Sequence, residues 1–403
     1  MAYVPPHKRV SKKGSSQNPT PTPKPELPPF HTNNKNSKHN SSAAGITGYA
    51  YEHIHRWFAA GLDDRNLFPP SVDLQPLYVE SANENVVQRL ALFNNTDSNE
   101  KQSNNRLTKS FNRGPWEYIA ETVLPDIHSS FEDFRNKMEE SDQNHVKFTP
   151  LIILRFGKVL FRRGCALSEE LLRGYRASFY TDILDSYIEY ILEEGASESG
   201  LKFKLEKEVY TVFFREATQP DDSMSMCCKC RVLEDGKLNP HKIEHSYAHH
   251  MLRDISCLEK NLDLRLDLST KKLVTNFSDD DLGSLKNLIS SAVVDKDVKG
   301  GLTWPMGMTF SGEKFKVVKV WRVRSKVYKN QRLRLKIKDV NRSLGREATK
   351  EVVIMLKGVV SELMKKDVDR KLISEMLKND LKVIWDNFLC CERFPKSITE
   401  ISK

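Results

Sequence analysis

Two neighbouring stretches of the sequence, residues 315–328 and 332–340, carry many positively charged side chains at alternating positions. Side chains alternate between the two faces of a β-strand, so the charged side chains should lie on one face and the residues between them on the other. Apolar residues such as Val323, Val327, Leu333 and Leu335 occupy the intervening positions. We therefore expect a β-hairpin with one apolar side and one cationic side that binds the phosphate groups of RNA or another polyanion. The cationic set is Lys316, Arg322, Arg324, Lys326, Arg332, Arg334, Lys336 and Lys338.

The same surface has an interpretation that needs no ligand. Charged side chains keep an exposed sheet edge soluble and discourage pairing with other chains. Trp321 and Tyr328 could stack on nucleobases, but Trp321 belongs to the apolar set, so we expect it in the core. The sequence leaves anion binding and edge protection as equal alternatives.

Cysteine and histidine residues with metal-ligand spacing occur at Cys227, Cys230, His245 and His249. Two cysteines separated by two residues, followed by two histidines separated by three, match the spacing of zinc sites. A zinc finger also needs a small ββα unit, whereas residues 224–233 alternate like one strand of a larger sheet, which would turn the two cysteines to opposite sides. We therefore expect strand cysteines and surface histidines here, and no cofactor.

Acidic residues raise the alternative of a metal-dependent enzyme acting on phosphate esters or activated sugars. Asp279, Asp280 and Asp281 contain the Asp-x-Asp pattern with which nucleotide-sugar transferases hold a divalent metal. Acidic residues directly after Ser278 also suit the positive end of a helix dipole. Neither glycine-rich phosphate-binding pattern, G-x-x-x-x-G-K-[ST] or G-x-G-x-x-G, occurs in the chain. The catalytic residues of any such enzyme are unknown.

Two expected strands each carry two carboxylates and one cation on one face: Lys204, Glu206 and Glu208 on the first, and Asp263, Arg265 and Asp267 on the second. If the sheet closed with these residues and the hairpin turned inward, the interior would hold carboxylates for a divalent metal and cations for phosphates. That arrangement resembles the tunnel-type triphosphate hydrolases. Their Glu-x-Glu-x-Lys strand is not matched, because the order here is Lys-x-Glu-x-Glu. The alternative is a solvated strand face with cross-strand ion pairs.

The composition points to an ordinary folded protein with a basic balance. The 403 residues include 63 Lys and Arg against 54 Asp and Glu, and the net charge of +9 favours acidic partners such as nucleic acid. The 7 cysteines are an odd number and several are adjacent or nearly so, which favours reduced thiols over a disulfide framework. No stretch approaches the ~18 apolar residues of a membrane span, and no secretory signal begins the sequence. We expect a cytoplasmic or nuclear protein without a membrane partner.

The composition also divides the chain. Residues 1–45 contain eight prolines and carry a charge of +6, so we expect a disordered basic arm. Residues 46–403 are expected to form one α+β domain, helix-rich over 46–200, strand-rich over 201–345 and helical over 346–392. Its sheet should be antiparallel and curled or closed, because successive strands would otherwise leave exposed edges.

The periodicity of apolar residues gives the individual elements. Helical spacing predicts helices over residues 51–60, 115–138, 168–191, 278–293 and 368–389. Alternation predicts strands over residues 76–79, 86–93, 203–214, 224–233, 238–247, 262–275, 315–328 and 332–340. Residues 148–161 predict a buried strand pair with its turn at Gly157, and residues 352–364 fit either a strand or a helix.

The N-terminal arm contains a short, stiff, basic peptide suited to docking on a partner in polyproline II form. Its docking residues are Tyr3, Pro5, Pro6, His7 and Arg9. The peptide is similar to one near the start of some DEAD-box RNA helicases, where it is associated with translation-initiation contacts. Lys8 stands where those peptides have a leucine.

Over most of its length the sequence resembles a plant protein family catalogued only as a domain of unknown function. Residues 1–9, 254–266 and 297–305 carry the resemblance. It implies an intracellular plant protein and no particular activity.

Overall fold

The structure is a computed structural model that describes residues 47–49, 52–54, 57–60, 72–80, 86–94, 114–141, 148–161, 177–218, 226–245, 248–258, 260–274, 277–294, 302–303, 314–341 and 349–389. The chain divides into Met1–Asn40 and Ser41–Lys403, and every described residue lies in the second unit. The predicted arm and its docking residues Tyr3, Pro5, Pro6, His7 and Arg9 lie outside the described residues.

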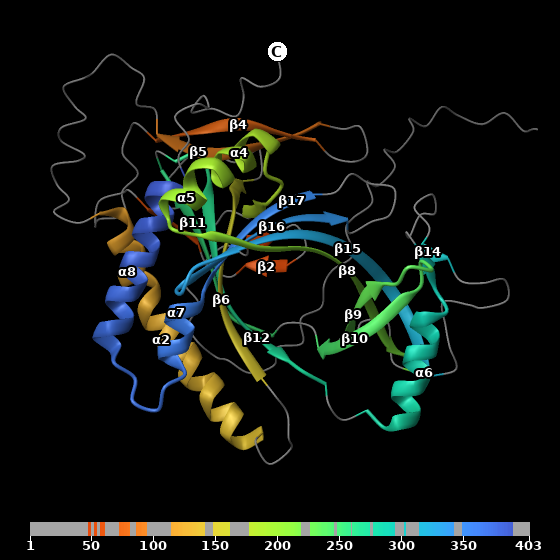
Figure 1. Cartoon of the computed structure of the whole chain (residues 1–403). Coiled ribbons are helices and arrows are strands. Elements are labelled where there is room, and N and C mark those ends of the chain that lie inside the picture. Colours follow the sequence, from red (N-terminus) through yellow and green to blue (C-terminus); the bar gives the residue numbers. More distant parts are fainter. Residues whose placement is uncertain are drawn as a thin grey trace, which may run out of the picture. The chain divides into compact units, whose positions relative to one another are not determined.

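Most of the described chain is β-structure (Figure 1). The strands are β1 (Thr47–Tyr49), β2 (Glu52–Ile54), β3 (Trp57–Ala60), β4 (Val72–Glu80), β5 (Val86–Asn94), β6 (Phe148–Phe161), β7 (Ala177–Tyr180), β8 (Lys202–Glu216), β9 (Met226–Val232), β10 (Leu238–His245), β11 (Ala248–Cys257), β12 (Asp263–Lys272), β13 (Val293–Val294), β14 (Leu302–Thr303), β15 (Phe315–Lys329), β16 (Leu333–Asn341) and β17 (Thr349–Leu356). The helices are α2 (Pro115–Ser141), α4 (Asp185–Tyr190), the π-helix η2 (Ile191–Gly195), α5 (Ala196–Glu198), α6 (Asp279–Ser290), α7 (Lys357–Leu363) and α8 (Arg370–Asn387).

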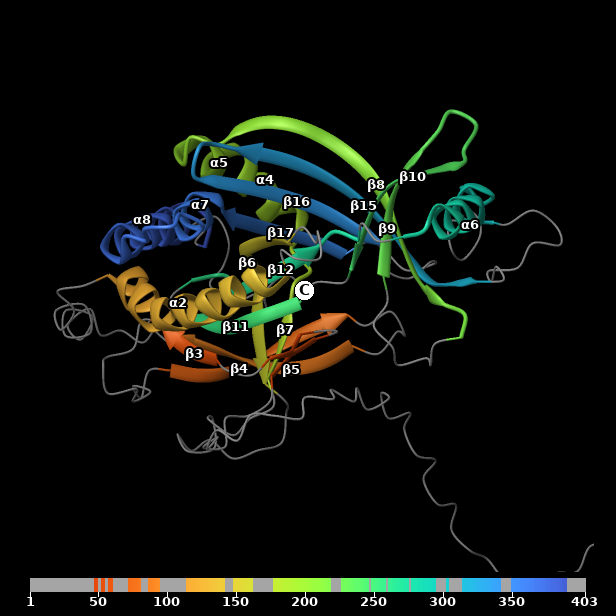
Figure 2. The same cartoon turned by 90° about the horizontal axis from the view of Figure 1, so that it is seen from below.

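One large sheet organises these elements, in the order β10-β9-β8-β15-β16-β17-β6-β12-β11-β3. Its ladders are antiparallel except where β3 pairs with β11 and β1 with β7. The sheet is not closed by a continuous ladder, but it curls until β10 meets the residues after β12 (Figure 2). There Glu244 and Leu273 form a single bridge, and Val274 N–H donates to the Ile243 carbonyl at 3.3 Å. The prediction of an α+β fold with a curled antiparallel sheet is confirmed.

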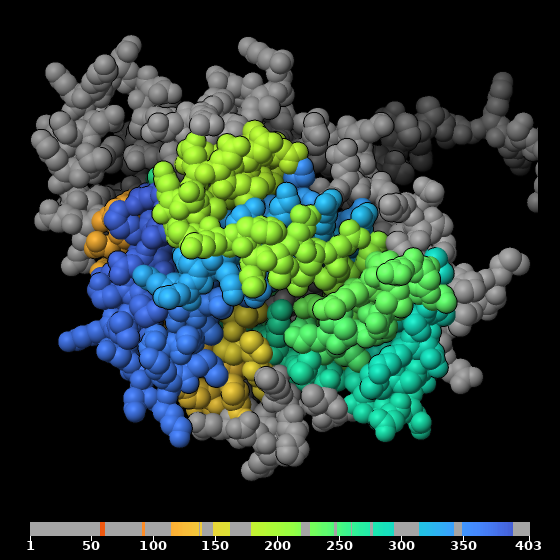
Figure 3. All heavy atoms as spheres, in the orientation of Figure 1, coloured from red at the N-terminus to blue at the C-terminus, as the bar shows by residue number. Residues whose placement is uncertain are grey.

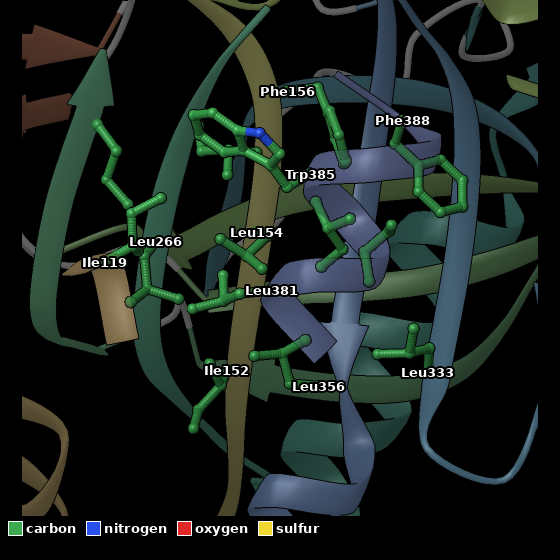
Figure 4. Close-up of a cluster of buried hydrophobic side chains, with 14 of the residues drawn as sticks. Ile119, Ile152, Leu154, Phe156, Leu266, Leu333, Leu356, Leu381, Trp385 and Phe388 are labelled. Atoms are coloured by element: carbon green, nitrogen blue, oxygen red, sulfur yellow. The ribbon is translucent and has the colours of Figure 1, made fainter. Parts of the chain in front are cut away.

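Helices cover the outside of the curl in two places. Helices α2, α7 and α8 pack over the main hydrophobic core, to which β6, β12, β16 and β17 contribute residues such as Leu154, Leu266 and Leu333 (Figure 4). Helix α6 covers a second core formed with β8, β9, β10 and β15, which includes Val212 and Val320. The space-filling view shows α6 and strands β8, β9 and β10 on one face of the molecule (Figure 3). Because these helices occupy the outer face, the alternate side chains of each strand point to the inside of the curl.

Local sequence signals explain the best-predicted helices. Ser278 caps α6, accepting a hydrogen bond from Asp281 N–H at 3.1 Å, and Asp369 caps α8 by accepting from the N–H groups of Lys371 and Leu372. Residues 352–364, which fit either a strand or a helix, contain one after the other: β17 ends at Leu356 and α7 begins at Lys357.

Three element predictions in the N-terminal half are wrong. Residues 51–60 form β2 and β3, because the apolar run that begins at Trp57 pairs in parallel with β11. Residues 168–191 are not one helix, since β7 precedes α4. Residues 148–161 are a single strand, β6, and Gly157 is no turn: a Cβ atom there would lie 2.1 Å from the Tyr180 carbonyl oxygen of β7. The region predicted as helix-rich therefore also contains strands β1 to β7.

Candidate functional site

The predicted cationic side of the hairpin is divided between two faces of the sheet. In the β15–β16 ladder, Arg324 is opposite Asp339, whereas Lys338 is opposite Ser325 and Lys336 is opposite Val327. Directly opposed residues of an antiparallel pair share a face. The arginines of β15 and the lysines of β16 consequently point in opposite directions, so the prediction of one surface carrying all eight cations is wrong.

The β15 arginines lie on the outer face and have carboxylate partners. Arg322 donates two hydrogen bonds of 3.1 Å to Glu208, and Arg324 Nε donates to Glu206 at 2.7 Å. These are the solvated cross-strand ion pairs that the sequence allowed. Glu206 and Glu208 are therefore turned away from the interior in which a tunnel-type metal site would need them.

The other predicted cations are dispersed. Lys326 is exposed on the outer face opposite Ile337, and Lys316 is exposed opposite Arg215. Arg332, in the β15–β16 turn, forms an ion pair with Asp380 of α8 at 2.5 Å and donates to the Met376 carbonyl oxygen at 3.0 Å. Arg332 thereby connects the hairpin to α8.

The inside of the curl instead gathers cations from four strands. We call this set the inner-face cations: Lys207 of β8, Lys229 and Arg231 of β9, Lys271 of β12, and Arg334, Lys336 and Lys338 of β16. Their strand neighbours pack outward against the helices, as Leu335 and Ile337 do beside Lys336. Positive charge from β12 and β16 acts on Lys207 of β8, although β8 is not hydrogen-bonded to either strand. The curl therefore brings together lysines that lie far apart along the sheet.

Lys336 is where this crowding is strongest. Burial, followed by the positive charges of Lys338, Lys271, Arg334 and Lys207, lowers the pKa of Lys336 from 10.5 to about 6. Burial and the charges of Lys229, Arg334, Lys271 and Arg231 also lower the pKa of Lys207. Among the residues that the structure describes, neither Lys207 nor Lys336 forms an ion pair.

Three of the buried carboxylates on the inner face, Glu244, Glu351 and Asp267, lie near these cations and already have partners. Glu244 lies 2.6 Å from Lys229 Nζ and 2.7 Å from Lys242 Nζ. Although burial acts to raise the pKa of Glu244, Lys271 and the two hydrogen-bonding lysines lower it to about 2.

The other two carboxylates belong to one network. Glu351 lies 3.3 Å from Lys338 and 3.7 Å from Arg155, while Asp267 lies 3.9 Å from Arg155 and 2.8 Å from His249. The inner face thus has a balanced region around Glu351 and Asp267, and a region of excess positive charge around Lys207 and Lys336.

The predicted zinc ligands are not assembled into a site. Cys230 lies in the buried core under α6, whereas Cys227, three residues away on the same strand, is on the opposite face beside Glu244. His249 Nδ1 pairs with Asp267. Within the described ranges, no group of three or more His, Cys, Asp or Glu residues could hold a metal ion.

The remaining acidic candidates have structural partners. Asp281 N–H donates to the cap residue Ser278, and the Asp281 carboxylate pairs with Lys314, as expected for a helix start. Asp263 is buried and accepts from the N–H groups of Val159 and Cys257 at 2.8 and 2.9 Å.

Four of the inner-face cations were not anticipated: Lys207, Lys229, Arg231 and Lys271. Lys229 and Arg231 alternate with the buried Cys228 and Cys230, so the sequence does place them on one side of a strand. It does not reveal that the strand faces β12 and β16 across a curl.

Comparison with solved structures finds matches at low sequence identity. The S. pombe Pct1 RNA triphosphatase matches with a TM-score of 0.40 and 10% identity over 67% of this chain and 90% of that chain. The same enzyme in complex with the Spt5 CTD gives 0.37 and 11% over 64% and 91%. HpAC1 of Hippeastrum, whose structure is described as revealing a dominant triphosphatase activity, gives 0.27 and 10% over 60% and 93%. With TM-scores below 0.5, these matches support no conclusion about activity.

The remaining comparisons concern the sequence. No curated protein matches the chain. None of the helices in the described part of the chain combines the length and apolar character that crossing a membrane would require. One family profile matches residues 41–388, and the chain therefore belongs to the family described as a domain of unknown function, DUF7903.

Proposed function

We propose that the inner face binds a chain of phosphate groups, such as an inorganic or nucleoside triphosphate, in the region around Lys207 and Lys336. The observation that carries the proposal is the convergence of lysines from β8, β12 and β16 on the inner face; burial and, after it, the charges of these neighbours lower the pKa of Lys336 to about 6. Like charges held close together destabilise a fold unless an anion neutralises them. A linear phosphate chain offers several negative charges in a row, which matches cations contributed by several strands of the curl.

Binding without catalysis is the form of the proposal that the site supports best. Glu244, Asp267 and Glu351 are each engaged by cations or histidine, and the described residues provide no group of metal ligands. A metal-dependent enzyme acting on the same phosphates is the alternative. It predicts phosphate release from tripolyphosphate in the presence of Mg²⁺ or Mn²⁺, and loss of that release in Glu351→Gln.

RNA is the other polyanion compatible with the net charge of +9. We propose it as a ligand only through its phosphates, and the cytoplasm or nucleus, where nucleotides and RNA are abundant, as the location. The predicted RNA-binding residues on the outer face, Arg322 and Arg324, are paired with carboxylates. An RNA site there would have to compete with those ion pairs.

Isothermal titration calorimetry with inorganic tripolyphosphate in EDTA-containing buffer tests the proposal. Lys207→Met should weaken binding by about tenfold, the loss expected when one charge-assisted hydrogen bond is removed. Arg324→Met is the matched control, because it removes one positive charge from the outer face of the same curled sheet. Affinity should also fall as salt concentration rises.

If the inner face is the site, Lys207→Met weakens the binding of tripolyphosphate and Arg324→Met leaves it unchanged. Wild-type protein that does not bind tripolyphosphate would reject the proposal. Equal weakening by Lys207→Met and Arg324→Met would also reject it, because binding would then reflect net charge and not the inner face.

A further inference from the structure

An aromatic cluster lies on the inner face beside the cations. The rings of Phe213 and Trp321 are 4.6 Å apart at an interplanar angle of 61°. Lys319 Nζ lies 4.6 Å from the centre of the Phe213 ring and 4.9 Å from that of Trp321. Proteins that bind nucleotide chains combine cationic grooves with aromatic side chains on which bases stack.

The register shows that this cluster is not part of the core under α6. Val212 and Val320 are directly opposed and both lie in that core. Phe213 and Trp321 follow them in sequence and therefore point to the opposite, inner face. The expectation that Trp321 belongs to the hydrophobic core is consequently wrong, since the strand irregularity between Val317 and Lys319 shifts the alternation of β15.

The same register connects the cluster to the inner-face cations. Trp321 is opposite Thr211 of β8, and Thr211 is opposite Lys229 of β9. Neighbouring strands lie about 4.8 Å apart, so the backbones at Trp321 and Lys229 are separated by about 10 Å. Lys207 lies on the same side of β8 as Thr211, four residues away. The aromatic rings and the inner-face cations thus lie on the same face of the sheet.

We infer that Trp321, supported by Phe213, stacks the base of a nucleoside oligophosphate whose phosphates lie on the inner-face cations. This inference rests on the proposed function and adds the class of ligand, a nucleotide in place of a bare phosphate chain. Stacking on an aromatic side chain tolerates any base, because every base presents a π-face.

A comparison of the affinities for three ligands provides the first test. Wild-type protein is titrated in EDTA with ATP, with UTP and with inorganic tripolyphosphate. Both nucleotides should bind at least about fivefold more tightly than tripolyphosphate, which is the lower end of what one stacked base contributes. Equal affinity for all three would overturn the inference and leave the proposed function intact. Failure of all three to bind would reject the proposed function itself.

Variants then locate the base. Trp321→Leu should reduce the affinity for ATP to that for tripolyphosphate and leave the affinity for tripolyphosphate unchanged. Trp116→Leu is the matched control, because Trp116 on α2 also has a lysine over its ring, with Lys382 Nζ at 4.5 Å, but packs against the outer core. Trp321→Phe, which keeps an aromatic ring, should retain most of the preference for ATP if the leucine variant does not fold. A preference for ATP that survives in Trp321→Leu, that Trp321→Phe abolishes, or that Trp116→Leu removes to the same extent would contradict the inference.

Discussion

Lys336 of β16 and Val327 of β15 are directly opposed in the hairpin ladder, so an amine and an apolar side chain share the inner face. Val327 is fully buried, and it supplies no charge to compensate that of the ammonium group. Val327 therefore does not offset the effects of burial and the surrounding cations, which lower the pKa of Lys336 to about 6. A position of this kind reduces the stability of the empty protein and favours an anionic ligand.

The first prediction concerns stability. The pKa of Lys336 is 10.5 in the unfolded chain and about 6 in the folded one. Folding therefore releases a proton at pH values between these two pKa values. The unfolded state binds more protons there, and stability should rise with pH. We expect Lys336→Met to raise the free energy of unfolding at pH 7 by about 1 kcal/mol or more, since one pKa unit corresponds to about 1.4 kcal/mol.

Urea unfolding at pH 7 and pH 9 measures this effect. The variant should lose part of the gain in stability that the wild type shows between the two values. Lys326→Met, an exposed lysine on the outer face of β15, is the control and should change stability by less than about 0.5 kcal/mol. A Lys336→Met protein less stable than the wild type at pH 7 would contradict the prediction.

The second prediction concerns protons taken up on binding. At pH 7.5 Lys336 is mostly neutral in the empty protein, because its pKa is about 6. A bound phosphate chain favours the charged amine and raises its pKa, so binding should take up a proton. Calorimetry with tripolyphosphate in buffers of different ionisation enthalpy should detect that uptake. The phosphate chain has protons of its own, and Lys336→Met separates the two contributions: an uptake unchanged in this variant would show that the lysine is not involved.

The sequence predicted the regular strands well, because alternation is a local property. Residues 203–214 and 315–328 correspond to β8 and β15 with small differences at the ends. It did not predict which residues face one another. A single-residue offset decides whether the arginines of β15 and the lysines of β16 share a face, and the turn between these two regularly paired strands sets that offset.

The four inner-face cations that the sequence did not predict were missed for the same reason: the sequence does not show which residues face one another. Lys207 and Lys271 are 64 residues apart in sequence, and neither belongs to the charged sets that the sequence singled out on the two strands. Only the order of strands and the curl bring the two lysines together. Strand β11 was not predicted either, since its buried Asp254 and exposed His249 obscure the alternation.

The third prediction concerns Gly157 of β6, beside the end of the antiparallel ladder with β7. A Cβ atom at Gly157 would lie 2.1 Å from the Tyr180 carbonyl oxygen and 2.6 Å from the Phe179 ring. Gly157→Ala must therefore displace backbone, and we expect a loss of about 2 kcal/mol or more in the free energy of unfolding. Gly283→Ala in α6 is the control, because nothing lies within 4 Å of that Cβ position and alanine favours a helix by about 1 kcal/mol. The two substitutions should shift the thermal midpoint in opposite directions, and a neutral Gly157→Ala would show that β7 can move away.

The fourth prediction concerns the ion pair between Arg265 of β12 and Asp254 of β11. The guanidinium donates two hydrogen bonds to the carboxylate, at 2.7 and 3.0 Å, and both residues are almost completely buried. Removing one partner leaves the other charge buried alone, so Asp254→Leu should cost about 3–5 kcal/mol of the free energy of unfolding. The double variant Asp254→Leu/Arg265→Met replaces the pair with apolar side chains and should recover most of that loss. Urea unfolding of the two single variants and the double variant measures the coupling, and costs that simply add would show that the two side chains do not depend on each other.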